Sequence, residues 1–242
     1  MCTVVYYPTK TKIFIASLRD ENINRAEAIP PFTYKQNEIK FIAPKDGLAA
    51  GSWIGINENG TTIVLLNGGY INHIPKENYS ESRGTIVISM LTSTNPIEFW
   101  QNKNMDNLAP HTLIFYSNDQ LYQLVWDGNE KKKCILDKTT SYIWSSATLY
   151  DKHAAKYREN LFNHWLQTEP LFTKNALLQF FREKTDHLNG FIIKRDNEIS
   201  TLSYSFIELQ KDEKAIVDYI DFRNNVASKV KISIRQLIHD FN

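Results

Sequence analysis

The first half and the middle of the chain consist of short apolar runs separated by polar turns. Short runs rich in valine, isoleucine and aromatic residues, bounded by turn residues, are typical of β-strands. The pattern predicts strands over residues 3–7, 13–18, 39–43, 52–57, 61–66, 112–117, 121–127 and 134–137. Glu58-Asn59-Gly60 is predicted to form a hairpin turn, because asparagine and glycine tolerate positive φ angles. Residues 21–38, which include prolines and glutamates, are predicted to form a loop.

The second half adds helical patterns and then returns to strands. Apolar residues recur at helical spacing over residues 152–167 and 173–184, and Thr173 is a favourable N-cap for the second of these helices. A short apolar segment, 83–93, precedes a further helix-like piece that opens at Thr94-Asn95-Pro96. Strands are predicted again over residues 200–207, 215–222 and 230–234. This order of elements, with hairpins throughout, predicts an α+β fold with mostly antiparallel sheets.

The composition is that of a compact protein with a sizeable core. Of the 242 residues, 42% are hydrophobic and 23% are charged, and the formal net charge is +1. A chain of this size can bury its core as one domain, which we expect to span residues 1–242. The near-neutral charge argues against nucleic-acid binding, which usually needs a basic excess on one face. No signal-peptide pattern or long apolar stretch is present, so we expect neither secretion nor membrane insertion.

The chain has two cysteines, Cys2 and Cys134, which do not make a disulfide framework and suit a reducing cytoplasm. Cys2 directly precedes the first predicted strand. Removal of Met1, which is common before a small second residue, leaves Cys2 with a thiol and a free α-amine on the same carbon. An α-amine has a pKa of about 8, so it is partly neutral at physiological pH and can accept the thiol proton. The alternative is that Cys2 is a small buried residue, the usual role of a free cysteine.

Residues of the second predicted strand supply charged groups near Cys2. The polar residues around Thr9-Lys10 join the first two strands as a hairpin, and a turn centred there places Cys2 opposite Ser17 and diagonal to Arg19. The guanidinium of Arg19 would favour the thiolate, and the carboxylate of Asp20 would hold and orient an ammonium group. A solvated charge cluster at the end of a strand fits the same pattern.

Other chemistries have little support in the sequence. The histidines form no pair at metal-ligand spacing, neither cysteine has a second one nearby, and the glycines form no phosphate cradle before a helix. We therefore expect no metal ion and no other cofactor. The histidines are His73, His111, His153, His164, His187 and His239.

A series of short motifs runs through about the first 90 residues. They are Met1 to Val5, Ser17 to Glu21, Pro30-Pro31, Asp46, Ala50 to Asn57, Gly60, Leu66-Asn67 and Ser82-Arg83-Gly84. In their order and approximate spacing they resemble the NRDE family, also called transport and Golgi organisation protein 2-like. That family is similar to the N-terminal nucleophile (Ntn) hydrolases, close to the penicillin V acylase and bile salt hydrolase group. The resemblance implies a four-layer αββα fold, with two sheets between helices.

The resemblance also adds Asn67 to the candidate site. Asn67 ends an apolar strand before Gly68-Gly69, which allow close backbone approach by a ligand. The matching asparagine of the acylase group donates a hydrogen bond to a developing oxyanion, and Asn67 would do the same here. The alternative is a turn residue before two glycines. Trp53 and Asn57 are interpreted as structural, and Arg83 is left outside the site.

The chain departs from the family pattern at three places. Leu18 stands where the family has the asparagine of its name, although Arg19, Asp20 and Glu21 follow as expected. Trp144-Ser145-Ser146 stands where relatives have Leu-Ser-Asn, so an asparagine that would line the pocket is replaced by Ser146. The nearest candidate for a Gly-Thr-Arg-type segment is Asn197 to Thr201.

Two hypotheses for the function follow. In the first, the protein is a cysteine amidohydrolase that cleaves a small non-peptide amide, with Cys2 as nucleophile, Arg19 and Asp20 as its supports and Asn67 as an oxyanion donor. In the second, the fold binds or carries a small apolar molecule without chemistry. Haem is one candidate ligand, since the resemblance extends to relatives linked to haem handling.

Overall fold

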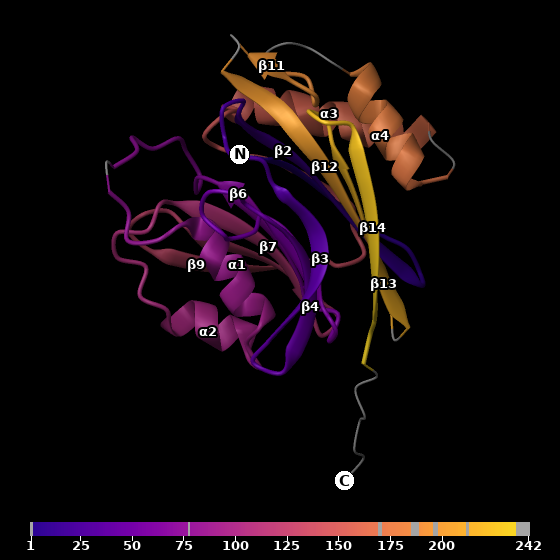
Figure 1. Cartoon of the computed structure of the whole chain (residues 1–242). Helices are drawn as coiled ribbons and strands as arrows, with labels where there is room; N and C mark the ends of the chain where they lie inside the picture. Colours follow the sequence, from indigo (N-terminus) through magenta and orange to yellow (C-terminus); the bar gives the residue numbers. More distant parts are fainter. Residues whose placement is uncertain are drawn as a thin grey trace.

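The computed structural model of the chain describes residues 2–76, 78–168, 171–184, 189–195, 198–211 and 213–235, and the side chain of Cys2 lies outside this description (Figure 1). Four positions named above, Met1, His187, Asn197 and His239, also lie outside the described residues. The elements form two antiparallel sheets stacked face to face, with helices on both outer faces. This is the four-layer αββα arrangement.

The first sheet has the strand order β10-β1-β2-β12-β13-β14, with β11 paired to β12. Its strands are β1 (Cys2–Pro8), β2 (Lys12–Asn22), β10 (Tyr142–Ser145), β11 (Lys194–Arg195), β12 (Ile199–Gln210), β13 (Lys214–Asp221) and β14 (Val226–Ser233). Every strand pair within the described part of this sheet is antiparallel. Because β1 lies between β10 and β2, the first described residues are held inside the sheet rather than at its edge.

The second sheet is a meander in which each strand pairs with the next one along the chain, in the order β3 to β9. Its strands are β3 (Ile29–Gln36), β4 (Ile39–Lys45), β5 (Ile54–Asn57), β6 (Thr62–Asn67), β7 (His111–Ser117), β8 (Gln120–Trp126) and β9 (Lys131–Leu136). Hairpin connections between neighbouring strands account for the antiparallel pairing. The long connection between β6 and β7 carries α1 (Arg83–Leu91) and α2 (Pro96–Asn102).

Helices cover the outer face of each sheet. The helices α3 (Lys152–Thr168) and α4 (Lys174–Glu183) lie against the first sheet, and α1 lies against β5 and β6 of the second (Figure 1). Successive residues of β1 therefore enter different clusters: Val4 joins the core between the sheets, whereas Val5 joins the core under α3 and α4. A strand that is covered on both faces is apolar at successive positions, which explains the unbroken hydrophobic run of β1.

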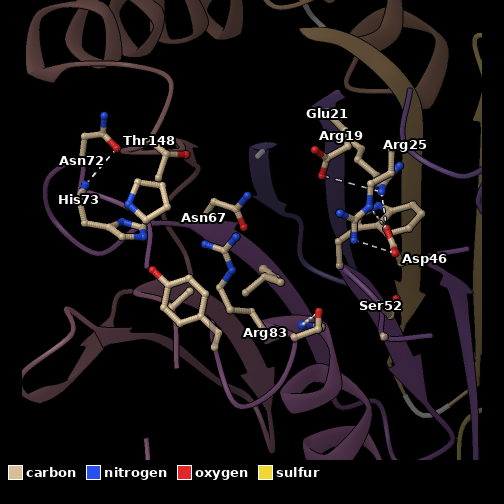
Figure 2. A pocket seen from close by; sticks show the side chains of 18 residues that line it. Arg19, Glu21, Arg25, Asp46, Ser52, Asn67, Asn72, His73, Arg83 and Thr148 are labelled. Carbon is tan, nitrogen blue, oxygen red and sulfur yellow. Dashed lines mark hydrogen bonds and ion pairs between the residues drawn. The ribbon is translucent and has the colours of Figure 1, made fainter. Parts of the chain in front are cut away.

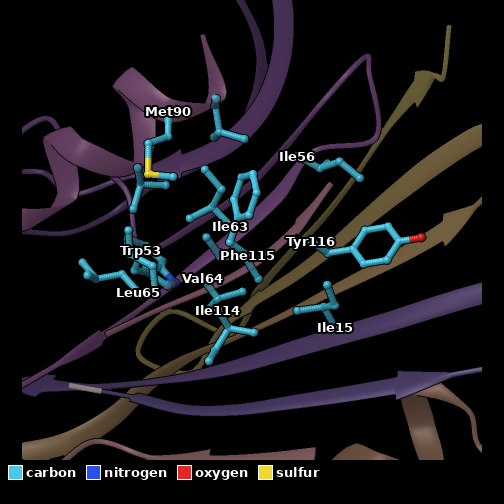
Figure 3. Close-up of a cluster of buried hydrophobic side chains, with 14 of the residues drawn as sticks. Ile15, Trp53, Ile56, Ile63, Val64, Leu65, Met90, Ile114, Phe115 and Tyr116 are labelled. Atoms are coloured by element: carbon cyan, nitrogen blue, oxygen red, sulfur yellow. The ribbon is translucent and has the colours of Figure 1, made fainter. Parts of the chain in front are cut away.

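Strands of both sheets contribute to the core between the sheets, among them β2 of the first sheet and β7 of the second. Ile15 of β2 faces Ile114 and Tyr116 of β7 across the interface (Figure 3). On the other side of the second sheet, Met90 of α1 packs near Ile63. All five side chains are buried. The second sheet therefore buries apolar side chains on both of its faces.

The α+β class, the antiparallel sheets and both long helices predicted from the sequence are confirmed. Thr173 caps α4, since its side-chain oxygen accepts a hydrogen bond from the N–H of Ala176 at 3.0 Å. Asn57 holds the turn after β5, where its amide donates to the carbonyl of Leu91 and its oxygen accepts from the N–H of Thr61. None of the helices in the described ranges is long and apolar enough to cross a bilayer.

Two predictions about local structure are wrong. Residues 21–38 are not a loop throughout, because β2 continues to Asn22 and residues 29–36 form β3. Trp53 is not in a strand, since β5 begins at Ile54. β3 lies at the edge of its sheet, where prolines are tolerated because half of the backbone N–H groups have no strand to pair with.

The register of the first hairpin also differs from the prediction. Cys2 pairs with Arg19, and Ser17 pairs with Val4 instead of Cys2. The centre of the turn therefore lies one residue later than Thr9-Lys10. A shift of this kind moves the pairing by two positions, so it leaves each residue on the face that the alternation predicts.

Candidate functional site

A cavity opens at one end of the two stacked sheets, where β1 begins, β6 ends and α1 begins. Its volume is about 460 Å³, which suits a small-molecule site. The loops that precede β5 and α1 complete its walls. Figure 2 shows that side chains from these separate parts of the sequence point into the same space.

One end of the cavity holds a network of paired charges (Figure 2). The carboxylate of Asp46 accepts hydrogen bonds from Arg19 Nη2 at 2.6 Å and from Arg25 Nε and Nη2 at 3.0 and 2.9 Å. Glu21 Oε2 lies 3.9 Å from Arg19 Nη2. The guanidinium of Arg19 also lies 4.5 Å from the centre of the Trp53 ring, a cation–π distance. The positive charges of two guanidinium groups are therefore neutralised by the negative charges of two carboxylates at this end of the cavity.

Asp46 is held as a carboxylate by its surroundings. Its Oδ1 also accepts from the N–H groups of Leu48 and Ala49, at 3.1 and 2.9 Å. Burial by itself would raise the pKa of Asp46, but the hydrogen bonds from Arg25 and Ala49 and the charges of Arg25 and Arg19 outweigh it and hold the pKa below its usual value. Asp46 therefore stays ionised at neutral pH and fixes both arginines.

Position 2 lies next to this network. Cys2 is the direct partner of Arg19 in the antiparallel pair of β1 and β2, and directly opposed positions share one face of a sheet. Arg19 lines the cavity and is almost fully buried, with 4% of its surface exposed. Of the four candidate site residues predicted from the sequence, the structure thus brings Cys2 and Arg19 together through the backbone register.

Asn67 lines the cavity from the last position of β6, and its role as an oxyanion donor stays a prediction. The hydroxyl of Ser146 supports this strand end, since it donates to the backbone carbonyl of Asn67 at 2.9 Å. Ser146 is fully buried and also lies 2.9 Å from the hydroxyl of Thr148, which lines the cavity. Ser146, where the resemblance predicts an asparagine, therefore holds the backbone of Asn67.

The two glycines after Asn67 lie close to other parts of the chain, and the approach of a ligand to them stays a prediction. Gly68 has a φ of +86°, and a Cβ there would lie 3.1 Å from a side-chain carbon of Thr148. A Cβ on Gly69 would lie 2.9 Å from the Cα of Asp127. Because neither glycine has a side chain, the end of β6 can pack directly against Thr148 and Asp127.

Asp20 lies away from the other candidates. It follows Arg19 in β2, so its side chain is on the opposite face, and it is completely buried. Its carboxylate accepts hydrogen bonds from Thr201 at 2.7 Å and Tyr150 at 3.3 Å. Burial raises the pKa of Asp20, and the two hydrogen bonds and the charge of Arg158 offset this only in part. Asp20 does not line the cavity, and its predicted role toward the amine of Cys2 stays a prediction.

The end of the cavity near α1 carries a third arginine, Arg83. Its Nη1 donates to the carbonyl of Pro110 at 3.2 Å. His73 lines the same cavity, and burial and the charge of Arg83 both lower the pKa of His73. Behind the wall, burial lowers the pKa of His111 to about 4, and Arg83 acts in the same direction. Both histidines are therefore neutral at pH 7. Arg83, which the sequence interpretation left outside the site, lines the same cavity.

A sequence profile of the family described as Transport and Golgi organisation 2 matches residues 1–216. The chain belongs to this family. A search of curated protein sequences gave no significant match.

Solved structures of two hydrolases share the fold of this chain. A cysteine-to-alanine mutant of the conjugated bile acid hydrolase from Clostridium perfringens aligns with a TM-score of 0.53 and 12% identity, covering 98% of this chain and 97% of that one. The Caenorhabditis elegans orthologue of N-acylethanolamine-hydrolyzing acid amidase aligns with a TM-score of 0.57 and 9% identity, covering 85% and 92%. At such low identity the likeness establishes the fold alone, which is the Ntn-hydrolase fold.

Sequence reasoning missed several residues of the cavity. Asp46 and Arg83 occur in the family motifs, so their positions carried a signal, but only the folded structure assigns them to one cavity. Arg25 lies in the segment that was predicted to be a loop, and no pattern pairs it with Asp46. His73 belongs to the long connection before α1, where periodicity carries no information.

Proposed function

We propose that this transport and Golgi organisation 2 protein is an N-terminal cysteine amidohydrolase that cleaves a small, non-peptide amide after Met1 has been removed. The observation that carries the proposal is the pairing of Cys2 with Arg19 at the wall of a cavity that also contains Asn67. The Ntn-hydrolase fold of the solved neighbours supports it.

The reaction follows from the groups at position 2. The α-amine of Cys2 takes the proton of its own thiol, and the thiolate attacks the amide carbon. The resulting oxyanion accepts hydrogen bonds from the amide of Asn67 and from a backbone N–H. The C–N bond then breaks, the ammonium group returns its proton to the leaving nitrogen, and a thioester remains. Water hydrolyses the thioester with the amine as base, which releases a carboxylic acid and restores the thiol.

Arg19 has an electrostatic role in this scheme. A guanidinium beside the sulfur favours the thiolate over the thiol. Asp46 and Trp53 hold the guanidinium in one place, so it needs no reorganisation when the charge on sulfur develops. Asp20 is proposed to orient the ammonium group from the other side of β2.

The test is hydrolysis of a panel of acyl amides, read as release of the fatty acid, by the processed protein and by Cys2→Ala. We expect intact-mass measurement to give a chain without Met1, and Cys2→Ala to lose all turnover. Cys134→Ala is the matched control, because Cys134 is exposed on β9 and outside the cavity. Turnover that survives in Cys2→Ala, or a purified chain that keeps Met1 and is still active, would overturn the proposal.

A second candidate function is binding of a small apolar molecule, with haem as the probe, without catalysis. The observation in its favour is Ser146, which stands where relatives have an asparagine and which holds the backbone of Asn67 instead of offering an amide to the cavity. In this case Cys2→Ala binds the ligand as tightly as the parent protein. A haem titration followed by the Soret band, in both proteins, separates the two functions.

We also propose a cytoplasmic location. The Cys2 thiolate of the proposed mechanism and the exposed thiol of Cys134 both stay reduced only in a reducing compartment. Fractionation of cells that express the tagged protein tests this.

A further inference from the structure

His111 is a buried histidine beside the cavity that the proposed reaction does not use. It is the first residue of β7 and is fully buried, and Ala109, two residues before it, lines the cavity. Its Nδ1 lies 2.9 Å from the backbone carbonyl oxygen of Ala109. Because a carbonyl oxygen can only accept a hydrogen bond, Nδ1 carries the proton of the neutral ring, and Nε2 is left as an acceptor.

The acceptor Nε2 of His111 is enclosed in the protein. Within the described residues, no hydrogen-bond donor reaches it. Burial lowers the pKa of His111 to about 4, so Nε2 does not take up a proton at neutral pH. Buried polar groups are almost always paired, because an unpaired acceptor bears the full cost of its lost hydration. Nε2 is therefore a position that suits a donor from a neighbouring side chain.

The strand register sets His111 directly opposite Asn67. The two residues are cross-strand partners in the antiparallel pair of β6 and β7. Opposed side chains lie on one face with their Cβ atoms about 4.5–5.5 Å apart, so a hydrogen bond between the imidazole and the amide is within reach. The amide of Asn67 points into the cavity and has no hydrogen-bond partner among the described residues (Figure 2). Rotation about the side-chain bonds of Asn67 brings its amide nitrogen toward Nε2.

The neighbour of His111 on its other side is already engaged. Trp126 of β8 is the second cross-strand partner of His111, and the indole N–H of Trp126 donates to the carbonyl of Leu108 at 3.0 Å. Of the two side chains directly opposite His111, the amide of Asn67 is thus the donor that remains. A carboxamide has a donating end and an accepting end of similar shape, so an acceptor beside it decides which end faces the cavity.

We propose that His111 is a positioning residue for Asn67: Nε2 accepts one N–H of the Asn67 amide, and the other N–H is thereby presented to the cavity. The oxyanion of the proposed reaction then meets a donor instead of the amide oxygen, which would repel it. His111 neither touches the substrate nor transfers a proton. The kinetic part of this inference rests on the proposed hydrolase function, whereas the hydrogen bond between His111 and Asn67 does not.

Nitrogen NMR of the imidazole tests this hydrogen bond without any substrate. The chain is labelled with ¹⁵N-histidine, and the His111 resonances are assigned by their loss in His111→Gln. At pH 7 we expect the proton on Nδ1, and we expect Asn67→Ala to move the Nε2 resonance to higher frequency, because a lone pair that accepts a hydrogen bond resonates at lower frequency than one that does not. The matched control, Asn72→Ala, leaves the resonance in place, since Asn72 lines the same cavity but is not opposite His111.

Two results of the NMR experiment overturn the inference. One is a proton on Nε2, and the other is an Nε2 resonance that is the same in Asn67→Ala as in the parent chain. Trp53→Phe is included because the indole N–H of Trp53 is also buried without a partner among the described residues. A resonance that responds to Trp53→Phe and not to Asn67→Ala assigns the donor to Trp53 and overturns the inference as well.

Two substitutions of His111 separate positioning from a structural role. Asparagine places its amide near the position of Nδ1 and can still donate to Ala109, whereas the longer glutamine reaches the position of Nε2 and can still accept from Asn67. With octanoyl 4-nitroanilide as substrate, we expect His111→Asn to lower kcat about 5- to 10-fold at unchanged KM, the effect of one lost hydrogen bond. His111→Gln keeps kcat near the parent value. A structural role through Ala109 predicts the opposite order of the two variants, and that order overturns the inference.

The double variant Asn67→Ala/His111→Asn completes the kinetic test. It is no slower than Asn67→Ala alone, because His111 acts only through Asn67, and a further loss of kcat overturns the inference. If no amide of the acyl panel is hydrolysed but Asn67→Ala moves the Nε2 resonance, the hydrolase proposal fails and the positioning of Asn67 stands. If the anilide is hydrolysed but the resonance does not respond, the hydrolase proposal stands and the positioning falls. The NMR comparison of parent and Asn67→Ala decides even if His111→Asn does not fold.

Discussion

Replacing Asp46 with asparagine removes one charge from the cavity wall and keeps the volume of the side chain. The asparagine oxygen can still accept from the N–H groups of Leu48 and Ala49, which bind Oδ1 in the parent chain. The position of Oδ2 becomes an NH₂ group, and there it faces the two donors that Oδ2 now accepts, Arg19 Nη2 and Arg25 Nε. The change therefore turns two charge-assisted hydrogen bonds into contacts between donors.

The loss of stability in Asp46→Asn depends on how well water can solvate each arginine once its carboxylate partner is gone. The side chain of Arg19 is 5% exposed and that of Arg25 is 28% exposed. Removing one partner of a buried ion pair costs about 3–5 kcal/mol. Glu21 remains 3.9 Å from Arg19 and compensates for part of this, and Arg25 can turn outward. We therefore expect Asp46→Asn to lower the free energy of unfolding by about 3 kcal/mol, the lower end of that range.

Urea unfolding of a double-mutant cycle measures this term. The cycle combines Asp46→Asn with Arg19→Met, and we expect a coupling energy of about 2 kcal/mol, as for residues in one charged network. Asp106→Asn is the matched control, because Asp106 is exposed, and it should change stability by less than about 0.5 kcal/mol. A loss below about 1 kcal/mol in Asp46→Asn, with no coupling to Arg19, would refute the view that Asp46 fixes the arginine.

The pH dependence of the same pair of proteins gives a second readout. The pKa of Asp46 is held below its usual value in the folded protein, so folding is favoured by the ionised form. The contribution is fully present above the unfolded pKa of about 3.9 and is lost as the pH falls through the lower folded pKa. The stability difference between parent and Asp46→Asn should stay constant from about pH 5 to 8 and shrink below about pH 4.

Three further changes test other parts of the structure by urea unfolding. Gly51→Ala should cost about 2 kcal/mol, since its Cβ would lie 2.5 Å from the backbone of Gly84, and a neutral result would contradict the close packing. Thr173→Ala should cost about 1 kcal/mol through the lost cap, whereas Thr173→Ser should cost little. Asp20→Asn should be at least about 1 kcal/mol more stable than Asp20→Leu, because asparagine is neutral and can keep the hydrogen bond from Thr201, whereas leucine cannot. Equal losses of unfolding free energy in the two variants would contradict this.

The faces of the first two strands were predictable, whereas their register was not. Alternation with a period of two assigns Cys2 and Arg19 to one face whether the turn centres on Thr9-Lys10 or one residue later. The polar residues between the strands do not fix the centre of the turn to within one residue. The observed register is the one that sets Cys2 directly against Arg19.

The strand β3 was not predicted from the sequence, and the reason is physical. Pro30-Pro31 interrupts the strand pattern near its start, and prolines are depleted in strands. It becomes a strand because β4 offers a free edge. The pairing of Arg25 with Asp46 is missed for the same kind of reason, since it arises from the path of the chain between β2 and β3.

Because Arg19 is paired with Asp46 and Glu21, the proposed chemistry depends mainly on the α-amine of Cys2 to activate the thiol. An unpaired guanidinium would stabilise a neighbouring thiolate strongly, but Arg19 already shares its charge with Asp46 at 2.6 Å and with Glu21 at 3.9 Å. Its effect on the thiol of Cys2 is correspondingly reduced. The remaining base is the α-amine, which exists as a free group only after Met1 is removed. A chain that keeps Met1 therefore retains the cavity and its paired charges, but it lacks the group that would activate the nucleophile in the proposed reaction.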